Sequence, residues 1–466
     1  MKKALTPEDW GLNTGINGEL MIGNISTVEL AKEFDTPLYV LNTDRLKETS
    51  LRFQSEVKKA YIGKTFIHYP FKCNSTPAVL EVLKESGLNA EVMTDFELEL
   101  ALEIGFKPNQ IIVNGPCKTD KFLSDCIERE VKLLIVDSLD ELEAINKILN
   151  EKNKTLKILL RVNPDYIPQN MNSGTATGSR KGSSFGLDLL GGEVHKALDI
   201  IKASPRIFFD GFHFHIGTGI RNPKDYSKAL NKLKPLIADT ASQGFKINTM
   251  DVGGGFASFT TRELTTFEML LYQSLNHYPS KFMLKEEYSF YDFALEISNK
   301  LFEMFPPFEL PDLIYEPGRS IVSQNQFLLL KVHRIKARNG EGKWLITDGG
   351  LGTITLPTFY EYHEVFLCND VKRPKEEHVN ITGPCCFAAD IVYKNKLMPK
   401  IERGEILALM DTGAYFNAME SNFGFPRPAI VSVTNNKAEL VRLRENFSTM
   451  VFRDKEFENL REEYIK

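Results

Sequence analysis

The chain has 466 residues, of which 42% are hydrophobic and 26% charged, the composition of an ordinary globular protein. This length is too great for one compact core, so we expect two domains. The 57 basic and 62 acidic residues leave a formal net charge of -5, and no lysine- and arginine-rich block occurs, which argues against nucleic acid as a partner.

The start of the chain and its cysteines indicate a cytoplasmic protein. Two lysines follow Met1 without an apolar stretch after them, so we expect no secretory signal. No run approaches the roughly eighteen apolar residues of a membrane helix. The cysteines form no CxxC pair and lack histidines at zinc-ligand spacing, so we expect reduced thiols and no metal. They are Cys73, Cys117, Cys126, Cys368, Cys385 and Cys386.

Short β-rich runs alternate with helical patterns over the first two thirds of the chain. Apolar residues recur at helical spacing in Thr76–Ser86 and Asp95–Ile104, and Thr94 precedes the second segment as a capping residue. Eight strands separated by helices predict a (β/α)8 barrel of the TIM type. The eight runs are Thr65–Phe71, Asn89–Met93, Gln110–Asn114, Val131–Asp137, Lys157–Asn163, Arg206–His215, Asn248–Val252 and Asp312–Glu316.

From about Gln324 onward, strand-like runs follow one another without long helices, which predicts a mostly antiparallel β-domain. The runs are QFLLLKVHRIKAR, KWLITDGG, HVNITG, EILALMD, AIVSVTN and AELVRLR. We therefore expect an α/β chain with a barrel at 45–320 and a C-terminal β-domain at 321–466. The segment 1–44, through Pro37–Leu41, is expected to add a strand to that β-domain. The aromatic-rich, charged residues 260–291 predict a helical excursion near the barrel mouth.

Unusual residues stand at the strand ends, where barrels of this type carry their functional groups. They are Lys72 after the first run, Glu91 on the second, Arg161 and Asn163 on the fifth, His213 and His215 on the sixth, Gly253 to Gly255 after the seventh, and Glu316 to Ser320 after the eighth. A lysine that faces a packed barrel mouth typically acts in its deprotonated form or forms an imine. The alternative for Lys72 is a side chain that extends into water.

Three further motifs each have two interpretations. Gly253, Gly254 and Gly255 allow backbone N–H groups to approach a phosphate closely, and they are equally consistent with a plain turn. Glu316 is suited to hold the pyridine nitrogen of pyridoxal phosphate (PLP) protonated, or to form an ordinary salt bridge. His215 is suited to stack on the pyridine ring, or to make a structural hydrogen bond.

Taken in order, these motifs resemble the PLP-dependent decarboxylases of the diaminopimelate and ornithine decarboxylase group, which combine a barrel with a β-domain. The resemblance runs from about Pro37 to Arg444 and rests on FKCN, HFHIGTG, DVGGGF and EPGRS. It implies that Lys72 holds PLP as a Schiff base and that Glu91 replaces an aspartate near that lysine. It implies the cofactor-binding residues Lys72, Glu91, Arg161, His215, Thr218, Gly253, Gly254, Gly255, Glu316, Gly318, Arg319 and Tyr415.

The β-domain carries two more motifs of this group. Gly383-Pro384-Cys385-Cys386 resembles G-P-x-C, which implies Cys386 as the catalytic proton donor beside Lys72 and Asp390 as the aspartate that follows. Residues 413–415 resemble GAY, whose tyrosine, here Tyr415, contacts phosphate. Active sites of the group form between two subunits, so the resemblance implies a homodimer. Each cysteine is also consistent with a small packed residue.

The expected substrate pocket departs from that of diaminopimelate decarboxylases. Phe387 replaces the glutamate that binds the distal amine, and Leu356 replaces an arginine for the distal carboxylate. A charged hydrogen bond contributes about 1.5–3 kcal/mol. The loss of each contact therefore lowers selectivity for diaminopimelate by an order of magnitude or more. Glu361 aligns with an acidic residue of the ornithine branch, or lies solvated in a loop. The expected substrate-binding residues are Arg319, Tyr360, Glu361 and Phe387.

We therefore expect the chain to decarboxylate an amino acid other than meso-diaminopimelate by preference, such as a siderophore, antibiotic or carrier-tethered intermediate. The alternatives are a diaminopimelate decarboxylase proper, an amino-acid racemase and an inactive PLP-binding regulator. Racemases of this fold pair the pyridine nitrogen with arginine, so Glu316 favours decarboxylation. The presence of both Lys72 and Cys386 argues against an inactive regulator.

Overall fold

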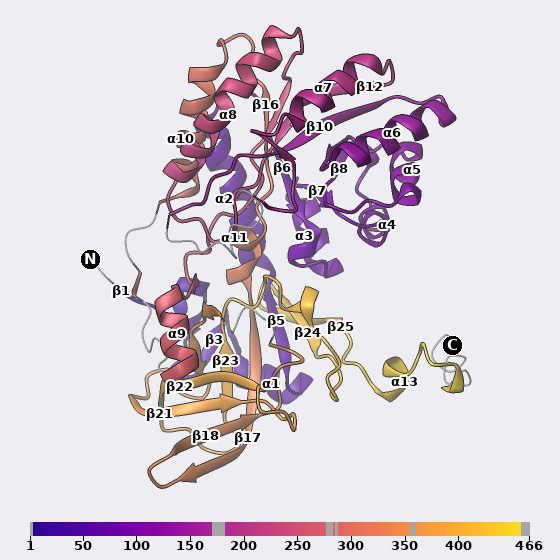
Figure 1. Cartoon of the computed structure of the whole chain (residues 1–466). Coiled ribbons are helices and arrows are strands. Elements are labelled where there is room, and N and C mark those ends of the chain that lie inside the picture. The colour runs from indigo at the N-terminus through magenta and orange to yellow at the C-terminus, as the bar shows by residue number, and fades with distance from the viewer. Residues whose placement is uncertain (1–2, 170–181, 276–282, 285–287, 355–359, 458–466) are drawn as a thin grey trace. The chain divides into compact units, whose positions relative to one another are not determined.

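A computed structural model describes residues 3–169, 182–275, 283–284, 288–354 and 360–457 (Figure 1). The chain forms two compact units, and each consists of separate stretches of sequence. The barrel unit comprises residues 47–257 and 287–321, and the β-domain unit comprises residues 1–46, 258–286 and 322–466. No helix within the described ranges is long and apolar enough to cross a membrane.

The barrel unit contains eight parallel strands that close on themselves, which confirms the predicted (β/α)8 barrel. The pairing of β9 with β10 closes the ring, because each strand between them also pairs with both of its neighbours. In spatial order the strands are β10 (Leu156–Asn163), β12 (Ile207–His213), β13 (Thr249–Asp251), β16 (Asp312–Tyr315), β6 (Thr65–Pro70), β7 (Asn89–Val92), β8 (Ile111–Val113) and β9 (Leu133–Val136). A short strand, β11 (Leu187–Asp188), adds to β10.

Helices precede, connect and follow the barrel strands. They are α2 (Thr43–Ala60), α3 (Pro77–Glu85), α4 (Asp95–Glu103), α5 (Asp120–Glu128), α6 (Leu139–Lys152), α7 (Glu193–Ala203), α8 (Lys224–Ser242), α10 (Phe290–Met304) and α11 (Arg319–Val322). Several begin at a hydroxyl cap: the Thr94 side chain accepts a hydrogen bond from the Glu97 N–H at 3.1 Å, as the sequence predicts. The longer helices α8 and α10 lie side by side in Figure 1.

Apolar side chains from strands across the ring pack together in the barrel interior. Ile112, Leu133, Ile135, Leu159 and Ile314 form one buried cluster with Phe66 against it. These residues come from strands that are not all neighbours in the sheet, so their side chains meet inside the ring. Because side chains alternate along a strand, the residue two positions further on points inward as well.

The β-domain unit is built on a mixed, largely antiparallel sheet. Its spatial order is β22 (Ile391–Pro399), β21 (Lys375–Thr382), β18 (Gly342–Thr347), β17 (Gln326–Arg338), β5 (Leu38–Asn42), β24 (Ala429–Thr434) and β25 (Lys437–Arg442). Strand β23 (Ile406–Leu409) pairs with β17 and with β20 (Val365–Leu367). The pairings β5–β24 and β18–β21 are parallel, and the other pairings in this sheet are antiparallel.

The segment between the seventh and eighth barrel strands differs from the prediction. It contains the expected helix, α9 (Thr266–Leu275), but residues 258–286 belong to the β-domain unit rather than to the barrel. The reason is pairing: β14 (Arg262–Glu263) is antiparallel to β19 (Glu361–Tyr362), and β15 (Met283–Leu284) is antiparallel to β1 (Lys3–Ala4).

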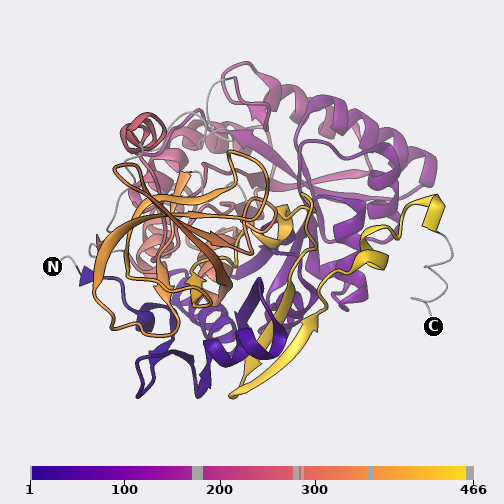
Figure 2. The same ribbon diagram turned by 90° about the horizontal axis from the view of Figure 1, so that it is seen from below.

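Smaller elements complete the β-domain unit. Strands β2 (Asn13–Thr14), β3 (Leu20–Ile22) and β4 (Ile25–Ser26) form a meander ahead of α1 (Thr27–Phe34). The C-terminal segment carries α13 (Phe447–Met450) and runs away from the strands of its own unit (Figures 1 and 2).

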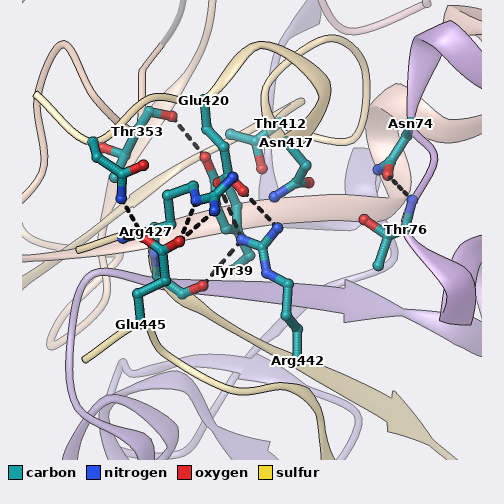
Figure 3. Close-up of polar contacts among 12 residues, drawn as sticks. Tyr39, Asn74, Thr76, Thr353, Thr412, Asn417, Glu420, Arg427, Arg442 and Glu445 are labelled. Atoms are coloured by element: carbon teal, nitrogen blue, oxygen red, sulfur yellow. Dashed lines mark hydrogen bonds and ion pairs between the residues drawn. The ribbon is translucent and has the colours of Figure 1, made fainter. Parts of the chain in front are cut away.

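Two arginine–glutamate pairs fasten the last strands (Figure 3). Arg442 makes a bidentate contact with Glu420, with nitrogen–oxygen distances of 2.6 and 3.0 Å. Arg427 Nε donates to Glu445 Oε1 at 2.7 Å. The side chains of Glu420 and Glu445 are largely buried. Dissolved salt therefore screens these ion pairs less than pairs between fully exposed side chains.

Candidate active site

A layer of polar residues lies at the C-terminal end of the barrel interior. Each strand contributes one of them, and in five strands it stands two positions after an apolar residue of the interior cluster. The eight residues are His68, Glu91, Asn114, Asp137, Arg161, His213, Asp251 and Glu316, all buried. Four carboxylic acids and one arginine are buried together here, which is typical of a functional site.

Lys72 joins this layer from the short helical turn η2 (Phe71–Cys73), directly after β6. Its Nζ lies 2.8 Å from Oε2 of Glu91, and the two side chains are 38% and 1% exposed. Burial raises the pKa of Glu91, and the Lys72 ammonium partly offsets that effect. The lysine therefore faces the polar layer, and its amine remains accessible.

Arg161 and His215 are adjacent in the same site. Arg161 Nη1 lies 3.2 Å from Asp137 Oδ1, and its guanidinium stacks on the Phe185 ring at 4.7 Å. The His215 Nδ1 accepts a hydrogen bond from the Gly254 N–H at 3.3 Å. Burial, with the Arg161 charge, lowers the pKa of His215 to about 3, so the imidazole is neutral. A neutral ring is suited to stacking.

Glu316 follows β16 and is 4% exposed. Its Oε1 accepts a hydrogen bond from Asn114 Nδ2 at 3.4 Å, and its Oε2 lies 3.7 Å from Nε2 of His213. Burial lowers the pKa of His213 well below its ordinary value. Glu316 is thus a buried carboxylate that no described lysine or arginine pairs with.

The three glycines form a tight turn beside Glu316. A Cβ at Gly253 would lie 2.7 Å from the Phe214 carbonyl oxygen, and one at Gly254 would lie 2.1 Å from the Glu316 carbonyl oxygen. Gly253 and Gly255 have φ values of 64° and 99°, in the region that favours glycine. The two interpretations of these glycines, a tight turn and a phosphate-binding loop, are therefore compatible.

Three other predicted residues belong to neighbouring loops of the barrel unit. Thr218 is half-buried after β12, Gly318 packs against Cys73 and Pro70, and Arg319 begins α11 with 8% exposure. Together with Lys72, Glu91, Arg161, His215, Gly253 to Gly255 and Glu316, they all lie at the C-terminal ends of barrel strands.

The remaining predicted residues belong to the β-domain unit. Cys386 is exposed on the loop between β21 and β22. Asp390 holds this loop: its Oδ2 accepts the Cys385 N–H and its Oδ1 accepts the Leu351 N–H, both at 2.6 Å. Burial and Asp390 raise the pKa of Cys385 to about 11, and its thiol donates to the Phe423 carbonyl at 3.4 Å. Cys385 is therefore held as a thiol, whereas Cys386 faces out.

Phe387 and Glu361 lie in different settings. Phe387 is 48% exposed and makes an edge contact with Phe423, with ring centroids 5.7 Å apart. Glu361 is 1% exposed and its Oε2 lies 3.1 Å from His363 Nε2, so the expectation of a solvated loop residue is wrong. It lies on β19, opposite Glu263 of β14. Tyr360 precedes it and is half-buried, and Leu356 lies outside the described residues.

Tyr415 is half-buried on the loop after β23, with a φ of 65° that is rare for tyrosine. The loop is fixed from Asp411, whose carboxylate accepts hydrogen bonds from Trp10 Nε1 at 3.0 Å and Thr260 Oγ1 at 2.5 Å. Gly413 is required there, because a Cβ would lie 1.8 Å from the Val322 carbonyl oxygen. Backbone strain at such a residue points to a functional position.

A cavity of about 780 Å³ in the β-domain unit contains none of the predicted site residues. Arg427, Arg442, Arg444 and Arg453 line it, with Glu420 and Glu445. Two of those arginines are paired with the two glutamates, so we do not assign the active site to it.

Sequence reasoning missed His68, Asn114, Asp137 and Asp251 as members of the polar layer. Asn114 and Asp137 each follow a short apolar run at the position where a strand ends, which is a signal for them, whereas Asp251 follows Thr249 and Met250 without such a run. The barrel residues fit PLP: an accessible lysine amine, a buried carboxylate for the ring nitrogen, a neutral imidazole for the ring face and a glycine turn for phosphate.

The comparisons with known proteins agree with this geometry. Residues 46–323 match the family described as "Pyridoxal-dependent decarboxylase, pyridoxal binding domain", and residues 267–413 match the corresponding C-terminal sheet domain. A diaminopimelate decarboxylase of Methanocaldococcus jannaschii is 30% identical over 94% of this chain and 95% of its own length. The enzyme of the same name from Aquifex aeolicus is 31% identical over 93% and 95%.

Solved structures show the same likeness. The diaminopimelate decarboxylase of M. jannaschii superimposes with a TM-score of 0.84 at 27% identity, covering 95% of this chain and 97% of that one. A second structure of it, a complex with L-lysine, matches equally well. The barrel, its polar layer and the matched domains lead to one conclusion: the chain belongs to the pyridoxal-dependent decarboxylases, PLP-dependent enzymes that remove the carboxyl group of amino acids.

Proposed function

We propose that the chain decarboxylates diaminopimelate with PLP bound at the C-terminal end of its barrel. We infer the position of this site mainly from Lys72, whose Nζ lies 2.8 Å from the buried Glu91 at the edge of the polar layer. The substrate is supported by relatives named diaminopimelate decarboxylase that are 30–31% identical over more than nine tenths of the chain. These relatives therefore favour the alternative from the sequence, a diaminopimelate decarboxylase proper, over an enzyme that prefers another amino acid.

The barrel residues have distinct proposed roles. Lys72 would hold the cofactor covalently, and the substrate amine would replace the Lys72 amine on it, which releases the lysine. Glu316 would lie against the pyridine nitrogen and keep that nitrogen protonated, and the neutral His215 ring would cover one face of the pyridine ring. Gly253 to Gly255, Thr218, Gly318, Arg319 and Tyr415 bind the phosphate. When bound, PLP supplies an electron sink for the pair of electrons that the departing carboxylate leaves behind.

Cys386 is the proposed proton donor. It stands on an exposed loop that Asp390 fixes, and its neighbour Cys385 is held by the Phe423 carbonyl. A thiol so placed is suited to return one proton to the α-carbon after carbon dioxide leaves. We propose that it does so in the active site of a second subunit of a homodimer, which the family resemblance implies.

Phe387 favours a second candidate, an amino acid whose far end is not charged. Its exposed ring offers no hydrogen-bond acceptor for a distal ammonium group. A desolvated charge that faces an apolar surface costs several kcal/mol unless another residue pairs with it. An intermediate with a larger or carrier-tethered tail would fit such a surface better.

A substrate panel tests both candidates. Purified holoenzyme is given meso-diaminopimelate, lysine, ornithine and α-amino acids with larger apolar tails, and carbon dioxide release is measured. Diaminopimelate should give the highest kcat/KM, at about 10⁴ M⁻¹s⁻¹ or above. A higher value for an uncharged tail would replace diaminopimelate with the second candidate. Release from none of them, by a protein that binds PLP, would contradict both candidates.

A further inference from the structure

Asp251 is a member of the polar layer to which neither the sequence motifs nor the proposed function gives a role. It ends β13 and is fully buried. In the sheet register it lies opposite His213 of β12 and Ile314 of β16. It is therefore two residues from Glu316 on the adjacent strand, counted along that register.

The two oxygens of Asp251 have different surroundings. Oδ1 accepts a hydrogen bond from the Gly253 N–H at 2.9 Å, which ties the side chain to the glycine turn. Oδ2 is buried and accepts no hydrogen bond from any residue within the described ranges. One ligand atom each from Asp251, Glu316 and His213 lies within 4.8 Å of the other two.

The charges around Asp251 disfavour its ionised form. Glu316 and Glu91 are the acidic side chains that act on it, and the low pKa of His213 leaves that ring neutral. Lys72 is paired with Glu91 and Arg161 with Asp137. Burial raises the pKa of Asp251 well above its ordinary value, and Glu316 adds to that effect. Two buried carboxylates this close share a proton rather than both ionising.

We propose that Asp251 is a neutral carboxylic acid whose hydroxyl donates a hydrogen bond to Glu316 while its other oxygen accepts the Gly253 N–H. Asp251 is then a positioning residue: it orients Glu316, stabilises its ionised form and couples it to the glycine turn. This inference rests on the proposed role of Glu316 at the ring nitrogen.

The chemical consequence concerns the location of one proton. A carboxylate that accepts a hydrogen bond from a neutral acid is a weaker base, because its anionic form is stabilised. The proton between Glu316 and the ring nitrogen therefore stays on the ring. A protonated ring is the stronger electron sink, so Asp251 acts on the reaction through Glu316 without touching the substrate.

Substitution of Asp251 by asparagine tests whether this residue acts as a neutral hydrogen-bond donor or as a negative charge. In Asp251→Asn the amide oxygen still accepts the Gly253 N–H and the NH2 group still donates to Glu316, so kcat should stay within about threefold of wild type. Asp251→Ala removes the donor, and kcat should fall about 10- to 100-fold with a smaller change in KM. If asparagine is as damaging as alanine, Asp251 works as an anion and the proposal is wrong.

A second measurement does not depend on activity. Infrared difference spectra of wild-type and Asp251→Asn holoenzyme should show the C=O stretching band of a protonated carboxylic acid in the wild type alone, and its absence would overturn the proposal. A divalent cation held by His213, Asp251 and Glu316 is the competing explanation. Stoichiometric metal in the purified enzyme, lost in Asp251→Asn, would replace the proposal with a metal site.

Glu316→Gln distinguishes failure of this inference from failure of the proposed function. If that variant leaves the visible spectrum of bound PLP unchanged, Glu316 does not contact the ring and the proposed function of the site is at fault. If Glu316→Gln changes the spectrum and Asp251→Ala does not, Glu316 keeps its role and only the inference about Asp251 is wrong.

Discussion

The amine of Lys72 lies 2.8 Å from a carboxylate oxygen of Glu91, a side chain that is only 1% exposed. Register explains the contact, because Pro70 at the end of β6 pairs with Glu91 on β7 and Lys72 follows two residues later. A buried anion thus orients an accessible amine at the mouth of a closed barrel.

Lys72→Ala should abolish both covalent PLP binding and decarboxylation. The Lys72 side chain is 38% exposed and its amine contacts Glu91 of the polar layer. The visible absorbance of lysine-bound PLP should disappear, and borohydride treatment should leave no peptide carrying the cofactor. Lys84, whose Nζ donates to the Ile104 carbonyl, provides the control: Lys84→Ala should retain the band. A reducible band in Lys72→Ala would show that another lysine binds PLP.

Cys386→Ala should lower kcat by about 100-fold or more, since a lost general acid typically costs 10²–10⁴-fold. Cys385→Ala is the matched control at the adjacent position, and it should stay near wild type because that thiol is held at the Phe423 carbonyl. Steady-state kinetics on the best substrate of the panel decide the comparison. The reverse ranking would move the proton donor to Cys385.

Mixed subunits test where Cys386 acts. If each active site combines Lys72 of one subunit with Cys386 of the other, mixing equal amounts of Lys72→Ala and Cys386→Ala protein should restore about one quarter of wild-type activity. Half of the dimers would be mixed, and each would contain one intact site. Native mass spectrometry verifies subunit exchange. Exchange without recovery would mean that one chain supplies both residues.

Phe387→Glu should raise kcat/KM for diaminopimelate by about 10- to 100-fold. A carboxylate at this position would pair with the distal ammonium, and a charged hydrogen bond contributes about 1.5–3 kcal/mol. The gain should be absent for an amino acid of equal length without the distal amine. Phe423→Glu, on the ring that contacts Phe387, is the control for an added surface charge. Equal gains in both variants would contradict a specific contact.

Lys396 should make the β-domain more stable as the pH rises from about 8 to about 10. Its buried Nζ donates to the His363 carbonyl at 3.1 Å, and burial lowers its pKa to about 8. The ordinary value is about 10.4. Between these values the unfolded chain binds more protons, so the free energy of unfolding increases by at most about 1.4 kcal/mol per pH unit.

Urea unfolding of Lys396→Met and wild type across this pH range measures that contribution. The difference between the two slopes is the relevant quantity, because burial raises the pKa values of Cys126 and Cys368, which act with the opposite sign. The exposed Lys400, just after the strand that carries Lys396, serves as the control, since Lys400→Met should keep the wild-type slope. Identical slopes for all three proteins would rule out titration of Lys396.

The barrel strands were predictable because each is a short apolar run between helices. The polar layer was only partly predictable. Strands of a closed barrel are buried on both faces, so the apolar pattern does not reveal which face points inward, and Asp251 looks like an ordinary strand end. Residues 258–286 were misplaced because their two-residue pairings, such as β14 with β19, leave no periodic signal. Glu361 was misjudged for the same reason.

Strand β5, made early in synthesis, has a consequence for how the chain folds. It pairs with β17 and, across nearly the whole sequence, with β24, where Leu38 lies opposite Ala429. Closing so long a loop is slow. Both edges of β5 therefore stay unpaired while the barrel residues are synthesised and collapse. A chain synthesised only as far as residue 428 would therefore contain every barrel strand and still expose an unpaired apolar strand edge. The interval before β24 is made is thus the period of greatest aggregation risk.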